Sequence, residues 1–133
     1  MSKSSELAQS WFKQAVLDVK AARSNAKEGN FEWACFASQQ AAEKFLKAFL
    51  FAQGQRVINS HSLKRLAEEA ADHDEAFLQL VDPGKALDRY YFAARYPDAL
   101  SGDVPGEYFT QTDADQAVSY AQNFKELVEK KLL

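Results

Sequence analysis

The chain has 133 residues, 47% of them hydrophobic and 26% charged, with a formal net charge of −3. This length fits one domain with a real hydrophobic core, and the apolar fraction excludes a disordered chain. The negative charge argues against broad electrostatic binding to nucleic acid, although it leaves room for a small local site. One cysteine and two histidines exclude an internal disulfide and a multi-histidine metal site, so we expect no metal and no cofactor. The sequence has no apolar leader and no run near the roughly 20 apolar residues of a membrane span, so we expect a cytoplasmic protein without membrane attachment.

Apolar residues recur every three or four positions almost throughout the chain, a period that predicts α-helices. A first helix is expected over residues 6–27, ending at Gly29. A second helix is expected over residues 31–53, capped by Asn30 and ending at Gly54.

The rest of the chain predicts shorter helices and one long one. A third helix begins near Ser60 or Ser62, a fourth segment is interrupted by Pro83-Gly84, and a last helix begins at Thr112. We therefore predict a single domain over residues 1–133, an all-α, up-and-down helical bundle of four to five helices.

The second predicted helix carries apolar residues on more faces than one buried side requires. Trp33, Phe36 and Phe51 lie away from its main apolar stripe, among the polar residues Gln40 and Lys44. Such a helix is either central in a bundle or presents this back face to a partner. We favour a partner, because a domain this small has little room to surround one helix. The expected interface residues are Trp33, Phe36, Gln40 and Phe51.

Signatures of phosphate-binding loops, dinucleotide folds, zinc proteases and serine hydrolases are absent from the sequence. Glu43 and Lys47 can pair across one helical turn, which is a weak chemical signal. Arg56 and His61 are separated by four residues in a connection between helices. A histidine can act as general acid or base and an arginine can hold a phosphate, so this pair is the minimal equipment for metal-free RNA cleavage. Residues in such a connection also commonly serve as caps and turn contacts, and both interpretations stay open.

A second cluster of arginines and tyrosines lies late in the chain. Arg89 and Tyr96 are seven residues apart, two turns along one helical face, and Arg95 lies beside Tyr96. Such residues can stack on a base and bind phosphate, or they can form a dimer interface. The candidate nucleotide- or phosphate-binding residues are Arg89, Arg95, Tyr96 and Lys44.

At these residues the chain resembles the HEPN family, and the resemblance covers nearly its whole length. Its most specific segments are Gln39-Gln40-Ala41-Ala42-Glu43-Lys44 and Arg95-Tyr96-Pro97-Asp98. The resemblance implies a four-to-five-helix bundle that is usually a homodimer. It also implies a partner, a minimal nucleotidyltransferase, in a toxin–antitoxin-like pair.

Some HEPN proteins are ribonuclease toxins with an arginine and a histidine separated by four to six residues on a late helix. Here the corresponding segment is Arg89 to Tyr96, and Ala94 stands in the place of the histidine. The resemblance therefore implies a module that binds a nucleotide, RNA or a partner protein and is not an independent enzyme. The alternative is a metal-independent ribonuclease toxin, with His61 as acid or base and Arg56 or Arg89 as phosphate stabiliser. A third interpretation is a structural protein that only dimerises.

Overall fold

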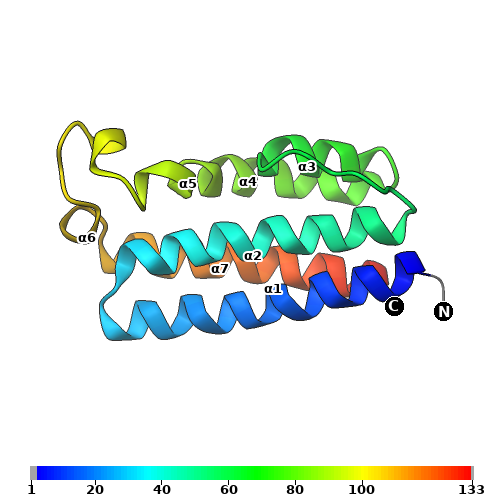
Figure 1. Ribbon diagram of the computed structural model, residues 1–133, viewed down its shortest axis with the longest axis horizontal. Helices are drawn as coiled ribbons and strands as arrows, with labels where there is room; N and C mark the ends of the chain where they lie inside the picture. Colours follow the sequence, from blue (N-terminus) through cyan, green and yellow to red (C-terminus); the bar gives the residue numbers. More distant parts are fainter. Residues whose placement is uncertain (1–2, 133) are drawn as a thin grey trace.

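The computed structural model describes residues 3–132, and this part of the chain folds as an all-α, up-and-down bundle, which confirms the predicted fold class. Three long helices lie side by side: α1 (Lys3–Glu28), α2 (Phe31–Ala52) and α7 (Gln111–Leu132) (Figure 1). A fourth rod of short elements lies along α2: η1 (Glu75–Leu80), α4 (Val81–Asp88) and α5 (Tyr90–Ala93). The remaining elements are α3 (Leu63–Ala71), η2 (Pro97–Leu100) and α6 (Pro105–Tyr108).

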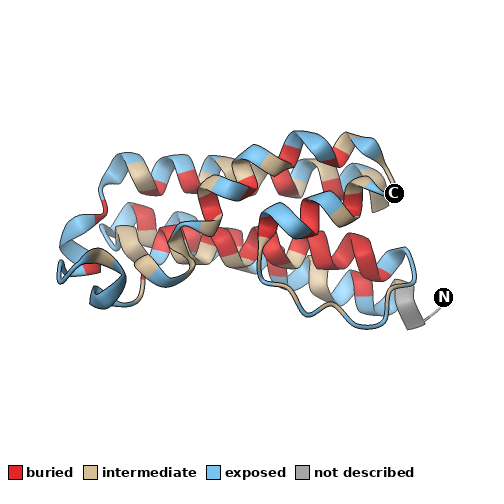
Figure 2. Cartoon of the chain, turned by 90° about the horizontal axis from the view of Figure 1, so that it is seen from above, coloured by how far each residue is buried: buried red, intermediate tan, exposed pale blue. Residues whose placement is uncertain are grey.

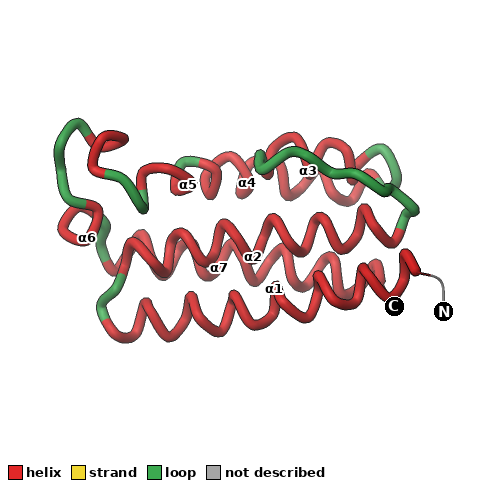
Figure 3. The backbone as a smooth tube through the Cα atoms, in the orientation of Figure 1, coloured by secondary structure: helices red, strands yellow, loops and turns green. Residues whose placement is uncertain are grey.

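The connection between α2 and α3 runs back along the bundle as a loop without helical turns, visible as the longest green stretch of Figure 3. It covers residues 53–62, and α3 follows it and packs beside η1 and α4. The next rod, η1–α4–α5, runs antiparallel to α2 (Figure 1). As a result α1 begins and α7 ends at the same end of the bundle.

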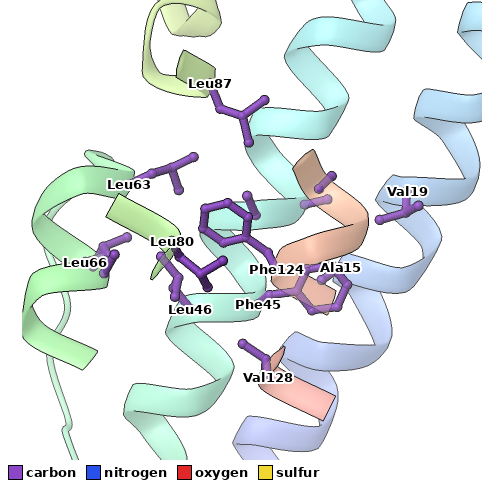
Figure 4. Close-up of a cluster of buried hydrophobic side chains, with 14 of the residues drawn as sticks. Ala15, Val19, Phe45, Leu46, Leu63, Leu66, Leu80, Leu87, Phe124 and Val128 are labelled. Atoms are coloured by element: carbon purple, nitrogen blue, oxygen red, sulfur yellow. The ribbon is translucent and has the colours of Figure 1, made fainter. Parts of the chain in front are cut away.

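The core forms where the apolar stripes of the long helices meet. Figure 2 shows that buried residues gather on the inward faces of the helices. Phe45 of α2 and Phe124 of α7 are fully buried, and the ring of Phe12 meets that of Phe45 at 5.2 Å between centroids. Each large side chain buried in this way stabilises the fold by about 1.5–3 kcal/mol. Figure 4 shows this cluster, whose labelled members are Ala15, Val19, Phe45, Leu46, Leu63, Leu66, Leu80, Leu87, Phe124 and Val128.

Helix α2 is the central helix of the bundle, so the prediction that its back faces a partner was wrong in part. It packs against α1, α7 and α3 and also against the shorter α4, α5 and α6. Phe51 is only 8% exposed because its ring packs against Trp11 of α1, at 5.5 Å between centroids. Helix α1 therefore covers the end of α2 that carries Phe51, while α4, α5 and α6 pack against α2 elsewhere.

Pro83 and Gly84 do not interrupt a helix, contrary to the prediction. Both lie in the first turn of α4, where backbone N–H groups have no acceptor within the helix and proline is tolerated. Gly84 faces α3 so closely that a Cβ there would lie 3.1 Å from Leu63 Cβ and 3.2 Å from its carbonyl carbon. The dipeptide therefore starts α4 and lets α3 approach it.

Two side chains cap the start of α3. Ser62 is the N-cap, as predicted, and its hydroxyl accepts a hydrogen bond from the Arg65 N–H. The carboxylate of Asp88, at the end of α4, accepts from the backbone N–H of Leu63 at 2.8 Å and of Lys64 at 3.2 Å. A charged side chain distant in sequence thus satisfies N–H groups that a helix start leaves free.

Replacing Asp88 with alanine is expected to lower the free energy of unfolding by about 1–2 kcal/mol, because the free N–H groups of α3 lose their acceptor. Urea denaturation followed by circular dichroism measures the change. Asp103 is an exposed aspartate in the loop before α6 and makes no side-chain hydrogen bond or ion pair within residues 3–132. Asp103→Ala is therefore the matched control, and an equal loss in both variants would contradict the capping role.

Candidate functional site

The chemically distinctive side chains meet where the 53–62 connection and α5 pack against α2. Nδ1 of His61 lies 3.1 Å from Oε2 of Glu43 on α2. The imidazole stacks on the ring of Tyr91 of α5, with 5.4 Å between centroids and 21° between planes. The guanidinium of Arg95 lies over the same tyrosine ring, 4.7 Å from its centroid. One tyrosine therefore links a histidine and an arginine that lie in different segments of the chain.

Beneath His61, three polar side chains occupy successive turns of α2. Lys47 Nζ donates to Glu43 Oε2 at 2.9 Å, and Gln39 Nε2 donates to Glu43 Oε1 at 3.4 Å and to the His61 carbonyl at 3.3 Å. The side chains of Glu43 and Lys47 are only 6% and 7% exposed. A carboxylate buried in this way is costly unless it is paired and hydrogen-bonded, and here lysine, glutamine and histidine all contact it.

Arg95 lies among aromatic rings. Its Nε donates to the Tyr91 carbonyl at 2.8 Å, which fixes the side chain against α5. The guanidinium carbon is 4.4 Å from the ring centroid of Phe36 and 5.0 Å from that of Tyr96. These distances suit cation–π attraction. The Nη groups of Arg95 donate no hydrogen bond to any residue between 3 and 132, so they are available to an anion.

Three large aromatic side chains near Arg95 are strongly exposed. Trp33 is 49% exposed, Phe92 62% and Tyr96 50%. Exposed rings beside a cation suit stacking on bases together with binding of phosphate. We call this region the His61–Arg95 surface; its members are Trp33, Phe36, His61, Tyr91, Phe92, Arg95 and Tyr96.

The other predicted cations do not join this surface through any direct interaction. Arg56 and Arg89 are exposed, and within the described part of the chain neither side chain forms a hydrogen bond or ion pair, so the predicted pairing of Arg56 with His61 is not seen. Lys44 pairs with Asp18 of α1 at 2.6 Å, which partly neutralises its charge. Gln40 donates to Gln39 at 2.7 Å and extends the buried network.

Ala94 belongs to the core, unlike its exposed neighbours Phe92 and Tyr96. Ala94 itself is 1% exposed, so the position that carries histidine in ribonuclease members of the resembled family faces inward here. Burial raises the pKa of the nearby Tyr90 phenol to about 12, and burial also raises the pKa of the Cys35 thiol to about 12. Both groups therefore stay protonated at neutral pH and supply no anionic nucleophile.

Sequence reasoning missed Gln39, Glu43, Lys47 and Tyr91 as site residues. The signal for the first three was a set of polar residues four positions apart on an otherwise apolar helix, which is unusual unless they satisfy one another. Tyr91 was part of a core stripe, and nothing in the sequence indicated that His61 packs on it.

A groove that shares no lining residue with this surface lies between the first turns of α1 and the last turn of α7. This groove has a volume of about 550 Å³ and is lined by Glu6, Gln9, Ser10, Phe12, Lys13, Glu129 and Leu132. Its lining contains no histidine or arginine, so the candidate site is the His61–Arg95 surface and not this groove. Among the described helices, none is both long and apolar enough to cross a membrane.

Comparison with known proteins gives consistent matches along nearly the whole chain. The profile of the HEPN domain family matches residues 8–131. A candidate toxin of Methanocaldococcus jannaschii is 27% identical over an alignment 126 residues long, and the match covers 89% of this chain and 83% of that protein.

Solved structures agree with this match. TT1696 from Thermus thermophilus superimposes with a TM-score of 0.88 and is 36% identical, over 93% of this chain and 97% of that one. An archaeal HEPN homologue, ST0689, has a TM-score of 0.78 and 33% identity, over 95% and 98% of the two chains. A HEPN domain protein of Thermotoga maritima has a TM-score of 0.72 and 27% identity, over 92% and 96%.

Proposed function

This chain belongs to the HEPN domain family, and on that basis we propose that it is a binding module whose His61–Arg95 surface holds a nucleotide or a short stretch of RNA. The observation that supports this proposal most is Arg95. Its guanidinium is fixed by one hydrogen bond and by aromatic rings, yet its Nη groups are unused within residues 3–132. A preorganised guanidinium loses little freedom when it binds a phosphate.

The rings around Arg95 supply the second half of such a site. Phe92 and Tyr96 expose large aromatic faces, which stack on bases of any sequence. Because the net charge of the chain is −3, we expect few phosphates to be bound and a shallow dependence of affinity on salt.

The biological setting that we propose is a toxin–antitoxin-like pair, supported by similarity to a candidate toxin of Methanocaldococcus jannaschii. In this setting the chain forms a homodimer and its partner is a minimal nucleotidyltransferase. The exposed Trp33, together with Phe36 and Gln40, is the proposed contact region on α2. Light scattering of the purified chain tests the dimer, and a monomer at micromolar concentration would rule it out.

A metal-independent ribonuclease is the second candidate, and one observation favours it. His61 contacts a buried carboxylate through Nδ1, as a histidine that transfers protons commonly does. Arg95, which shares Tyr91 with His61, takes the phosphate-binding role that the sequence assigned to Arg56 or Arg89.

Fluorescence anisotropy with a labelled 12-nucleotide oligouridine in EDTA tests the binding proposal. Replacing Arg95 with alanine is expected to weaken binding about tenfold or more, since a hydrogen bond to a charged group is worth about 1.5–3 kcal/mol. Arg65 of α3 is an exposed arginine whose side chain makes no hydrogen bond or ion pair in the described chain, so Arg65→Ala is the matched control.

Two outcomes would contradict the proposal: no binding by the wild-type protein, or equal weakening by both arginine substitutions, which indicates only general charge attraction. Gel analysis of the same samples tests the second candidate. Cleavage by the wild type and none by His61→Ala would establish the ribonuclease.

A further inference from the structure

The buried network beneath His61 determines which of its ring nitrogens carries hydrogen. Glu43 Oε2 accepts from the ammonium of Lys47 at 2.9 Å and lies 3.1 Å from His61 Nδ1. An ionised carboxylate has only acceptor sites, so the hydrogen of this contact must be on Nδ1. Nε2 of the neutral imidazole is then an acceptor.

Three contacts fix His61, two to its ring and one to its backbone. Glu43 contacts Nδ1, Tyr91 stacks on one face, and Gln39 donates to the backbone carbonyl of His61. The carboxylate is itself held by Lys47 and is almost fully buried, so it cannot follow a rotating imidazole into solvent. The His61 side chain is nevertheless 57% exposed, and Nε2 makes no hydrogen bond within residues 3–132.

We infer that Glu43 is a positioning residue that holds His61 as the Nδ1–H tautomer, so that the exposed Nε2 accepts a hydrogen bond from a ribose 2′-hydroxyl. The inference rests on the proposed function, since it names what that surface selects. A 2′-hydroxyl is a donor next to a phosphate, and deoxyribose lacks it. His61 and Arg95 both contact Tyr91, so an acceptor for the hydroxyl and a guanidinium for the phosphate belong to one surface.

The tautomer can be measured without any ligand. Long-range ¹H–¹⁵N NMR spectra of labelled protein at about pH 8, where an ordinary imidazole is neutral, distinguish the two tautomers. The chain has two histidines, and His73 serves as internal reference because no carboxylate contacts its ring in the described chain. We expect Nδ1–H at His61 in the wild type and a mixture in Glu43→Gln. An Nε2–H form of His61 in the wild type would overturn the inference whether or not the variant folds.

Ribose selection is measured with two 12-nucleotide probes of one sequence, oligouridine and oligodeoxyuridine, in EDTA. The wild type should bind the ribose probe about tenfold more tightly, the factor expected for one hydrogen bond. Glu43→Gln and His61→Ala should lose this preference, measured for each variant as the ratio of its own affinities for the two probes. His73→Gln should keep it.

Equal wild-type affinity for the two probes would overturn the selection of ribose. Binding of neither probe would overturn the proposed function and the selectivity together. In that case the NMR spectrum still decides whether Glu43 positions His61.

Discussion

Replacing Glu43 with leucine is expected to lower the free energy of unfolding by about 3–5 kcal/mol, because it leaves the ammonium of Lys47 buried without its counter-charge. The Lys47 side chain is only 7% exposed, and its sole hydrogen bond within residues 3–132 goes to Glu43. Contact with the Trp11 ring, 5.6 Å away, compensates only a small part of that loss. Since small domains have total stabilities of about 5–15 kcal/mol, urea denaturation should show the variant close to unfolding.

A second substitution distinguishes the effect of leaving Lys47 unpaired from the effect of changing the side-chain volume at position 43. Glu43→Leu combined with Lys47→Met replaces a buried ion pair by apolar side chains of similar size, a change that is often neutral. We therefore expect the double variant to regain most of the stability. The exposed pair Lys64–Glu68 has the same spacing, and Glu68→Leu should change the stability by less than about 1 kcal/mol. Equal stability of the single and double variants would show that the unpaired lysine is not the cause.

The double variant also separates stability from function. It removes the carboxylate that contacts His61 while restoring the packing of α2. A protein that is folded and stable but has lost its preference for ribose would show that the network does more than hold the bundle together. Such a loss is attributed to the missing carboxylate, because Tyr91 and Arg95 are unchanged and the contacts of Lys47 are with Glu43 and Trp11, not with His61.

The long helices could be predicted from sequence because their signals are local. The apolar period, Gly29 with φ of 86° and Gly54 with φ of 93° define where α1 and α2 end. The start of α7 was predicted slightly late: Thr110 and Asp113, not Thr112, form the capping pair, with the Thr110 N–H donating to the Asp113 carboxylate at 2.9 Å. Capping residues at neighbouring positions give similar local patterns, and only the backbone path decides between them.

The surroundings of α2 could not be predicted in the same way. Part of its apolar back is covered within the chain, since Phe51 is buried while Trp33 stays 49% exposed, and periodicity does not reveal which residues are covered. Trp11 of α1 covers Phe51, whereas the short elements α4 and α5, within residues 75–93, pack against other parts of α2. Short helices have weak periodic signals, so their joint path was not visible in the sequence.

The candidate site depends on the same non-local path. His61 was recognised for its chemistry, but its partners Glu43 and Tyr91 lie on other elements, well away from it in the chain. The extended 53–62 connection brings them together, and nothing in its composition determines its direction. Arg95 and Tyr96 were predicted as binding residues, and the structure places Arg95 against Tyr91 and Tyr96. The binding role itself stays a prediction.

Phe77 anchors the η1–α4–α5 rod to α2, and Phe77→Ala is expected to lower the free energy of unfolding by about 3–5 kcal/mol. Phe77 lies in η1, is fully buried, and its ring centroid is 4.3 Å from that of Phe49 on α2. A 3₁₀ segment has weak hydrogen-bond geometry, so it relies on such side-chain anchors. Leu78, its neighbour, is 58% exposed, and Leu78→Ala should cost less than about 0.5 kcal/mol.

The consequence for the site follows from chain connectivity. η1 leads directly into α4 and α5, which carry Asp88 and Tyr91. At the other end of η1, its N-cap residue Asp74 contacts Lys131 of α7 at 2.7 Å. That hydrogen bond from Lys131 lowers the pKa of the Asp74 carboxyl, and it can keep η1 attached to α7 when Phe77 is removed. We therefore expect Phe77→Ala to loosen the rod without releasing it, so that the His61 ring-current shift from Tyr91 decreases in NMR spectra before the bundle unfolds. If the shift stays at its wild-type value while stability falls, Tyr91 is positioned by α2 and the 53–62 connection alone.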